Sequence, residues 1–282
     1  MRQLIVNADD FGLHELINRG IVEGHAAGCI TSTTIMAGGS AFEHAVELSK
    51  QHPKLGMGVH LTLVGASPVA RADIHTLLTR EGMLFSTYSE FIKRYIFGQI
   101  SRAHIDYELR CQMQKVVGRG IQITHIDSHQ HLHALPGMAQ VIGGIAKDFN
   151  VRKIRIPAEP LWFRSPGPLT FNRFFARAAL TGCSYLAGHF FRRQGLYAPQ
   201  HFFGMLAGGA MSPAAMQHII QSLPDGVSEI MVHPGKNTQA LEQIFPWGYH
   251  WQEEMEALTS KKVMAAIREG NIQLITYREL TN

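Results

Sequence analysis

Residues 2–12 read RQLIVNADDFG, and residues 14–28 read HELINRGIVEGHAAG. The first stretch is an apolar run that ends in two acidic residues and a glycine, which is typical of a β-strand and the turn after it. In the second stretch apolar residues and glycines recur with helical spacing, at Leu16, Ile17, Gly20, Ile21 and Gly24. The two stretches together predict a strand followed by a helix.

The same alternation continues along the chain. Further strand-like segments lie at 31–38, 55–65, 121–129, 151–157, 228–235 and 271–277. Helix-like segments lie at 41–51, 105–120, 136–150, 214–226 and 251–270. Such alternation favours a parallel sheet with crossover helices, and this number of strands favours a barrel over an open sheet. We therefore predict an α/β fold, a distorted, TIM-barrel-like (β/α) barrel with about seven parallel strands.

Composition indicates one globular unit. The chain has 282 residues, of which 45% are hydrophobic and 17% are charged, and no repeat or low-complexity linker divides it. We expect a single domain over residues 1–282. Between Pro160 and Pro224 there is no Asp or Glu, whereas arginines and aromatic residues are frequent, so we predict a basic, aromatic insert at about 161–205. We expect it either to pack as a lid over the barrel or to meet a lipid-linked sugar or an anionic membrane face.

Net charge and cysteine content limit the classes of binding partner and the cellular compartment that we expect for the protein. The formal charge of +4 is too small an excess to indicate nucleic acid binding. Cys29, Cys111 and Cys183 match neither a disulfide framework nor a zinc knuckle. The N-terminus lacks the apolar core of a signal peptide. We expect a cytoplasmic protein that binds no nucleic acid, with peripheral membrane contact as an open alternative and a homodimer as the default assembly.

Polar residues that could do chemistry gather at the carboxyl ends of the predicted strands. They are Asp9 and Asp10, His60, four histidines within 125–133, Arg155 and His233. In a parallel barrel these ends open on one face, where such folds place their active sites. We therefore expect residues that are distant in sequence to converge.

Each of these residues also has a purely structural interpretation. Asp9 and Asp10 could form a turn in which one aspartate caps the next helix. Because adjacent residues at a strand end point in different directions, one carboxylate could instead bind a metal while the other acts as a base. His60 could equally be a core histidine of the barrel wall.

The stretch ITHIDSHQHLHALP at 123–136 is harder to explain structurally, since loops seldom place four histidines within nine residues. One carboxylate and two imidazoles form a usual ligand set for a catalytic divalent metal. Asp10, His60 and His129 supply such a set, and Asp127 or His125 could orient a ligand. Whether His125 or His131 replaces His129 stays open at this point.

Five motifs carry a family resemblance: ADDFG at 8–12, GVHLTL at 58–63, THIDSHQHLH at 124–133, IRIPAEP at 154–160 and HPG at 233–235. In this order and at these separations they resemble the YdjC-like carbohydrate deacetylases. With GGSAFEHA at 38–45, they look most similar to the hopanoid biosynthesis-associated, HpnK-type branch.

The resemblance implies a role for each residue. Asp10, His60 and His129 would bind a divalent metal ion, Zn or Mg. Asp9 would be the catalytic base, oriented by Arg155, and His233 would be the general acid. If His233 is not the acid, His125 or His131 is the next candidate.

We thus expect a metal-dependent hydrolase that removes an N-acetyl group from an N-acetylglucosamine-type sugar, either free or carried on a lipid such as a hopanoid. Two other classes remain as alternatives. One is a metal-dependent phosphoesterase, which would need two metals close together. The other is a non-catalytic metal-binding or sugar-binding barrel, which would have no use for the second carboxylate of Asp9.

Overall fold

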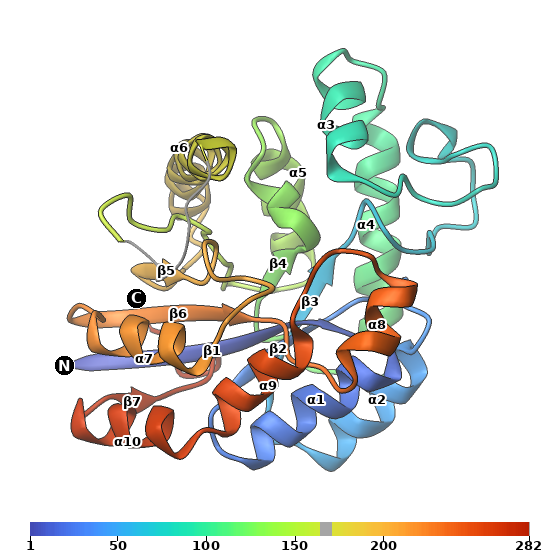
Figure 1. Cartoon of the computed structure of the whole chain (residues 1–282). Coiled ribbons are helices and arrows are strands. Elements are labelled where there is room, and N and C mark those ends of the chain that lie inside the picture. The colour runs from blue at the N-terminus through green and yellow to red at the C-terminus, as the bar shows by residue number, and fades with distance from the viewer. Residues whose placement is uncertain (164–170, 282) are drawn as a thin grey trace.

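The computed structural model describes residues 1–163 and 171–281, with the backbone alone for 171–176. A parallel sheet forms its centre (Figure 1). The strands are β1 (Arg2–Phe11), β2 (Ser32–Ile35), β3 (Gly56–Leu61), β4 (Ile126–Ser128), β5 (His201–Phe203), β6 (Gly226–Val232) and β7 (Gln273–Leu274). They are ordered β4-β3-β2-β1-β6-β5, and β7 pairs with β1. The sheet curls into a half-barrel, which confirms the predicted α/β fold with about seven parallel strands.

Strand β1 lies in the middle of the sheet and pairs with three other strands. It is buried continuously from Leu4 to Phe11, as expected for a strand with layers on both faces. Along one edge it pairs with β6 from Arg2 to Ala8. Its other edge pairs first with β7, at Gln3 and Leu4, and then with β2 from Asn7 onward. The carboxyl end of β1 therefore lies deep inside the molecule, between β2 and β6.

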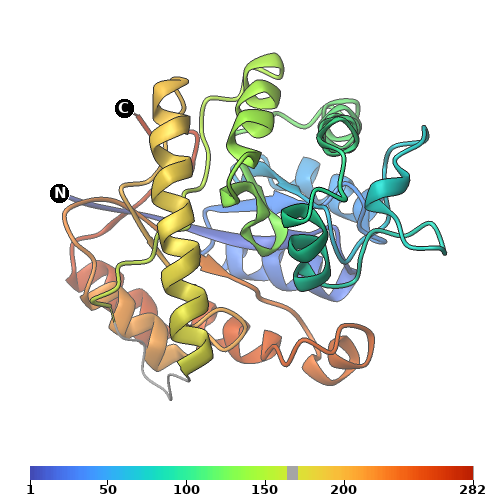
Figure 2. The same ribbon diagram turned by 90° about the horizontal axis from the view of Figure 1, so that it is seen from above.

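Helices cover the sheet on both sides. They are α1 (Glu15–Ala26), α2 (Phe42–Gln51), α3 (Tyr88–Ile96), α4 (Arg102–Val117), α5 (Met138–Asp148), α6 (Phe171–Arg193), α7 (Pro213–Gln221), α8 (Thr238–Ile244), α9 (Trp251–Thr259) and α10 (Lys261–Glu269). Helices α1, α2, α9 and α10 lie below β1 and β6 in Figure 1, whereas α4, α5 and α6 lie above them. Seen from above, α6 runs beside α5 along this second side (Figure 2). Among the described helices, none combines the length and apolar character needed to cross a bilayer.

Two predicted elements differ from the structure. Residues 151–157 form no continuous strand: Ile154 and Lys153 make single bridges, to Ile126 of β4 and to Tyr197. Pro157 has no N–H for a ladder hydrogen bond, so pairing does not extend past it. The predicted helix 251–270 is interrupted at Ser260, which is extended at φ −67° and ψ 126°. Here the Thr259 hydroxyl bonds the Met255 carbonyl, an interaction through which serine and threonine disturb helices.

The basic, aromatic insert predicted at 161–205 contributes α6 and β5, and its residues 164–170 lie outside the described residues. Its helix is tied to the body of the protein by a buried arginine. Arg177 donates to the carbonyls of Phe163 and Leu161, each at 3.0 Å, and lies 3.6 Å from the buried Glu159 carboxylate. Glu159 in turn accepts from the backbone N–H of Gly204 at 2.9 Å. These contacts fix α6 against the carboxyl end of β5.

Candidate active site

The carboxyl end of β1 carries two aspartates that point in different directions. The β1–β2 register shifts between Ala8 and Phe11, and Asp10 has φ +66°. A bulge of this kind re-aims side chains and is frequent beside active sites. Aspartate is one of the few residues that tolerate this left-handed region. Asp9 consequently faces Arg155, whereas Asp10 faces two histidines.

The first cluster contains Asp10, His60 of β3 and His129, which directly follows β4. Asp10 Oδ1 lies 3.0 Å from His129 Nδ1 and 3.4 Å from His60 Nε2. Burial alone would raise the pKa of Asp10, but the two imidazoles outweigh it and hold that pKa well below its ordinary value. The second oxygen, Oδ2, is buried and has no hydrogen-bond partner among the described residues. One ligand atom from each residue lies within 4.8 Å of the others, as a metal site requires.

The orientation of His60 is fixed from behind. Its Nδ1 lies 2.7 Å from Asp127 Oδ1, and the Thr34 hydroxyl donates to Asp127 Oδ2 at 3.1 Å. This leaves Nε2 facing Asp10, in the arrangement typical of a metal-binding histidine supported by a carboxylate. Burial opposes a charge on His60, yet Asp127 and Asp10 raise its pKa to about 10.

The second cluster is organised by Arg155, whose side chain is fully buried. Its two terminal nitrogens donate to both oxygens of Asp9, at 2.6 and 2.7 Å, and one of them also lies 2.7 Å from Asp127. Its Nε donates to Glu229 at 2.8 Å, and Glu229 also accepts from the Tyr277 hydroxyl at 2.6 Å. Burial raises the pKa of Glu229 to about 7 despite the arginine. One guanidinium thus serves three carboxylates.

The charged side chains around each cluster indicate which of the two could hold a metal ion. A second group, Asp9, His60 and Asp127, also has the spacing of a metal site. Arg155, however, already neutralises both of its carboxylates, so that position holds a cation supplied by the chain. Of these two groups, the Asp10 cluster is the one with a buried carboxylate oxygen that has no hydrogen-bond partner among the described residues. A single divalent ion there would balance the excess of buried carboxylates, and the residues present fit it.

Two of the four histidines of 125–133 are committed to structural bonds. His125 Nε2 lies 3.1 Å from the Asn7 side-chain oxygen, and Asn7 donates to Asp9 at 2.9 Å. The His125 ring stacks on Tyr277 at 3.6 Å, and burial lowers its pKa to about 3. His133 Nε2 lies 3.0 Å from the Arg155 carbonyl, which fixes the backbone of that residue. Neither His125 nor His133 lies in the Asp10 cluster.

His233 follows β6 and enters the site from the opposite side. Its backbone N–H donates to Glu254 at 2.5 Å. Its Nδ1 is buried and has no partner among the described residues. The ring meets Tyr249 edge-on at 5.0 Å, and Trp247 lies 5.4 Å from the His129 ring.

This aromatic wall was not predicted from the sequence, although the density of rings in FPWGYHW at 245–251 indicates it. The buried Glu229 was not predicted either, although it is a single acidic residue within the apolar strand SEIMV at 228–232.

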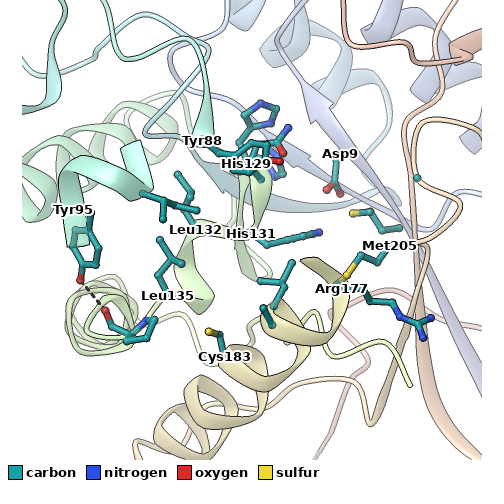
Figure 3. A pocket seen from close by; sticks show the side chains of 18 of the residues that line it. Asp9, Tyr88, Tyr95, His129, His131, Leu132, Leu135, Arg177, Cys183 and Met205 are labelled. Carbon is teal, nitrogen blue, oxygen red and sulfur yellow. Dashed lines mark hydrogen bonds between the residues drawn. The ribbon is translucent and has the colours of Figure 1, made fainter. Parts of the chain in front are cut away.

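Part of each cluster, though neither Asp10 nor Arg155, borders a cavity of about 940 Å³ (Figure 3). At one end it is lined by Asp9, His60, His129, His131, His233 and Tyr249. The other end lies between α3, the segment 132–136 and α6, and its lining is mainly apolar, including Ile92, Ile96, Ile100, Leu132, Leu135, Leu180 and Cys183. The cavity thus joins a charged, histidine-rich end to an apolar one.

The protein is thus an α/β protein with a curled parallel sheet. The carboxylates and imidazoles at the ends of its strands form a site suited to hydrolysis. The chain matches the YdjC-like protein family over residues 3–269 and belongs to it. It is 32% identical over 279 residues to a carbohydrate deacetylase of Brevibacillus brevis, with 99% of both chains covered. The carbohydrate deacetylase of Geobacillus stearothermophilus is 32% identical over 282 residues, covering 99% of this chain and 98% of that one.

A solved structure has the same fold. A crystal structure from Enterococcus faecalis V583 superposes with a TM-score of 0.80 at 24% sequence identity, covering 100% of this chain and 99% of the other. The strand arrangement described above is therefore shared with an experimentally determined protein.

Proposed function

We propose that the protein removes an N-acetyl group from an N-acetylglucosamine-type sugar by metal-dependent amide hydrolysis. The observation that carries this proposal is the placement of two differently paired carboxylates side by side. Asp9 is held by an arginine, and Asp10 faces two imidazoles and keeps one oxygen unpaired. Full-length relatives at 32% identity are carbohydrate deacetylases, which supports the same reaction.

Asp10, His60 and His129 are our assignment for the metal ligands. Mg²⁺ prefers oxygen ligands, so a set with two imidazoles favours zinc or another transition ion. A divalent ion at this position supplies Lewis-acid polarisation of the acetamide carbonyl and activation of water. His129 is preferred over His125 and His131 because it alone of the three lies in the Asp10 cluster.

Asp9 would act as the general base. The Arg155 guanidinium donates to both of its oxygens and fixes them, and Asn7 adds a third hydrogen bond. A carboxylate held in this way can accept a proton from water without turning away from the cavity. Arg155 is thus a positioning residue for the base.

His233 would protonate the leaving amine. It borders the same cavity as Asp9, and its backbone is held by Glu254 while its Nδ1 has no partner among the described residues. An amine is a poor leaving group until it is protonated, so amide hydrolysis needs a donor at this position. The edge-on contact with Tyr249 limits the directions in which the ring can donate.

The apolar end of the cavity favours a sugar that carries a hydrophobic group. A cavity of about 940 Å³ is at the upper end of the range for small-molecule sites. An N-acetylated sugar placed with its acetamide at Asp9 would leave the end beside α3 and α6 for an apolar aglycone. A lipid-linked sugar, of which a hopanoid glycolipid is the example that the resemblance suggests, fits this division.

The octyl and methyl β-glycosides of N-acetylglucosamine test the substrate class, because they differ only in the apolar group. We expect Leu180→Asp on α6 to raise KM for the octyl glycoside about tenfold or more, since it places a charge in the apolar wall. KM for the methyl glycoside should stay unchanged. Leu186→Asp is the matched control, because Leu186 lies on the same helix and is 73% exposed. Equal effects of the two substitutions would contradict an apolar subsite.

A further inference from the structure

Of the four histidines in 125–133, only His131 has no defined task so far. His125 and His133 bond Asn7 and the Arg155 backbone, and His129 faces Asp10. For His131, the described residues provide no hydrogen-bond partner to Nδ1, although that atom is buried. A buried ring nitrogen without a partner has a substantial cost unless something else satisfies it.

The backbone holds His131 in an unusual conformation. Gln130 and His131 both have φ +55°, so two successive residues other than glycine are left-handed. Each such residue costs on the order of 1 kcal/mol, and such strain concentrates at functional sites. The turn carries the chain from His129 to His133 and brings the His131 ring beside that of His133.

The ring of His131 extends into the cavity. It borders the same opening as Asp9 and His233, and Figure 3 shows it reaching toward the side on which Asp9 and Met205 lie. One flank meets Phe202 edge-on at 5.8 Å, and another contacts His133 at 6.4 Å. These contacts hold the plane of the ring while satisfying neither nitrogen.

We propose that His131 binds the substrate, by a hydrogen bond from its imidazole to one hydroxyl of the sugar ring that carries the reacting acetamide. This inference rests on the proposed deacetylase function and extends it to substrate recognition. A hydroxyl both donates and accepts, so it pairs with either tautomer of a neutral imidazole. The sugar ring must lie at this end of the cavity, because its acetamide has to reach Asp9.

The alternative is that His131 only packs against Phe202. A site built to bond a hydroxyl discriminates strongly against a substrate that lacks it, because its own polar group is then left unpaired. A packing residue gives no such discrimination. The two roles therefore differ in how the enzyme treats deoxygenated substrates, even if both variants are less active.

The test measures kcat/KM for acetate release from octyl N-acetylglucosaminide and its analogues deoxygenated at carbon 3, 4 or 6. For the wild type, kcat/KM for one analogue should be at least about fivefold lower than for the parent compound, the factor for one hydrogen bond between neutral groups. His131→Phe keeps an aromatic ring against Phe202 but has no nitrogen, so it should not distinguish that analogue from the parent. His131→Asn is the second variant, because asparagine tolerates the left-handed backbone and its shorter side chain leaves the cavity.

Two results would overturn the assignment. If His131→Phe or His131→Asn, folded and with unchanged metal affinity, discriminates the analogues as the wild type does, His131 makes no bond to a hydroxyl. If either variant loses the metal, His131 is a ligand instead. A wild type that releases acetate from none of these compounds contradicts the proposed function itself, and the assignment of His131 with it.

Discussion

Replacing Arg155 with methionine tests the buried charge network at its centre. Methionine fills much of the arginine's volume but leaves Asp9, Asp127 and Glu229 without their shared cation. Removing one partner of a buried ion pair typically costs about 3–5 kcal/mol. Because Arg155 serves three carboxylates, we expect the upper end, or a fall in Tm on the order of 10 °C. The carboxylates can take up protons instead at low pH, so the loss of stability should grow as pH rises.

The assay is thermal unfolding of metal-free protein at about pH 5 and about pH 8. Arg119→Met is the matched control, because Arg119 makes three hydrogen bonds to Glu43 on an exposed surface. Its removal should leave the Tm close to that of the wild type, since exposed pairs contribute little. If Arg155→Met unfolds within about 2 °C of the wild type at both pH values, the buried network does not hold the site together.

Three further predictions concern single residues of the site. Asp9→Asn should lower kcat about 10²–10⁴-fold, the usual range for a lost general base, while calorimetry shows metal affinity unchanged; a loss of metal would make Asp9 a ligand. His233→Ala should lower kcat for acetate release by a similar factor with little change in KM, and an unchanged rate at neutral pH would move the acid role elsewhere. Burial raises the pKa of Glu229 from 4.5 to about 7, so the stability that its protonated form supplies is complete below pH 4.5 and is lost as pH rises through about 7. Glu229→Gln should abolish that loss in urea unfolding of metal-free protein, and an equal pH dependence in both proteins would show that Glu229 does not titrate in this way.

The fold was predictable where local patterns and long-range pairing agree. The apolar run of β1 and the helical spacing of α1 identify a βα unit, and both elements are present. The segment 151–157 has a strand-like pattern yet makes only single bridges, whereas the short β5 pairs with β6 from His201 to Phe203 without a strong pattern of its own. Such pairings depend on which segments meet in space, and local propensity does not contain that information.

The convergence of Asp10, His60 and His129 was predictable because the ends of parallel strands meet on one face. The partners behind them were less accessible to sequence reasoning. Glu229 meets Arg155 across 74 positions of the chain, and the Trp247 ring reaches His129 from the loop between α8 and α9. A buried polar residue in a strand signals that a partner exists, but only the fold identifies it.

Acetate release by the metal-loaded protein, compared with Asp10→Ala, tests the central claim most directly. The substrates are N,N′-diacetylchitobiose in one tube and octyl N-acetylglucosaminide in the other. We predict release that is lost in Asp10→Ala and abolished by a chelator in the wild type, with the octyl glycoside reacting faster. Acetate release that persists in Asp10→Ala would contradict a metal-dependent reaction at this site. If the metal-loaded wild type releases no acetate from either substrate, that result would contradict deacetylation of such sugars.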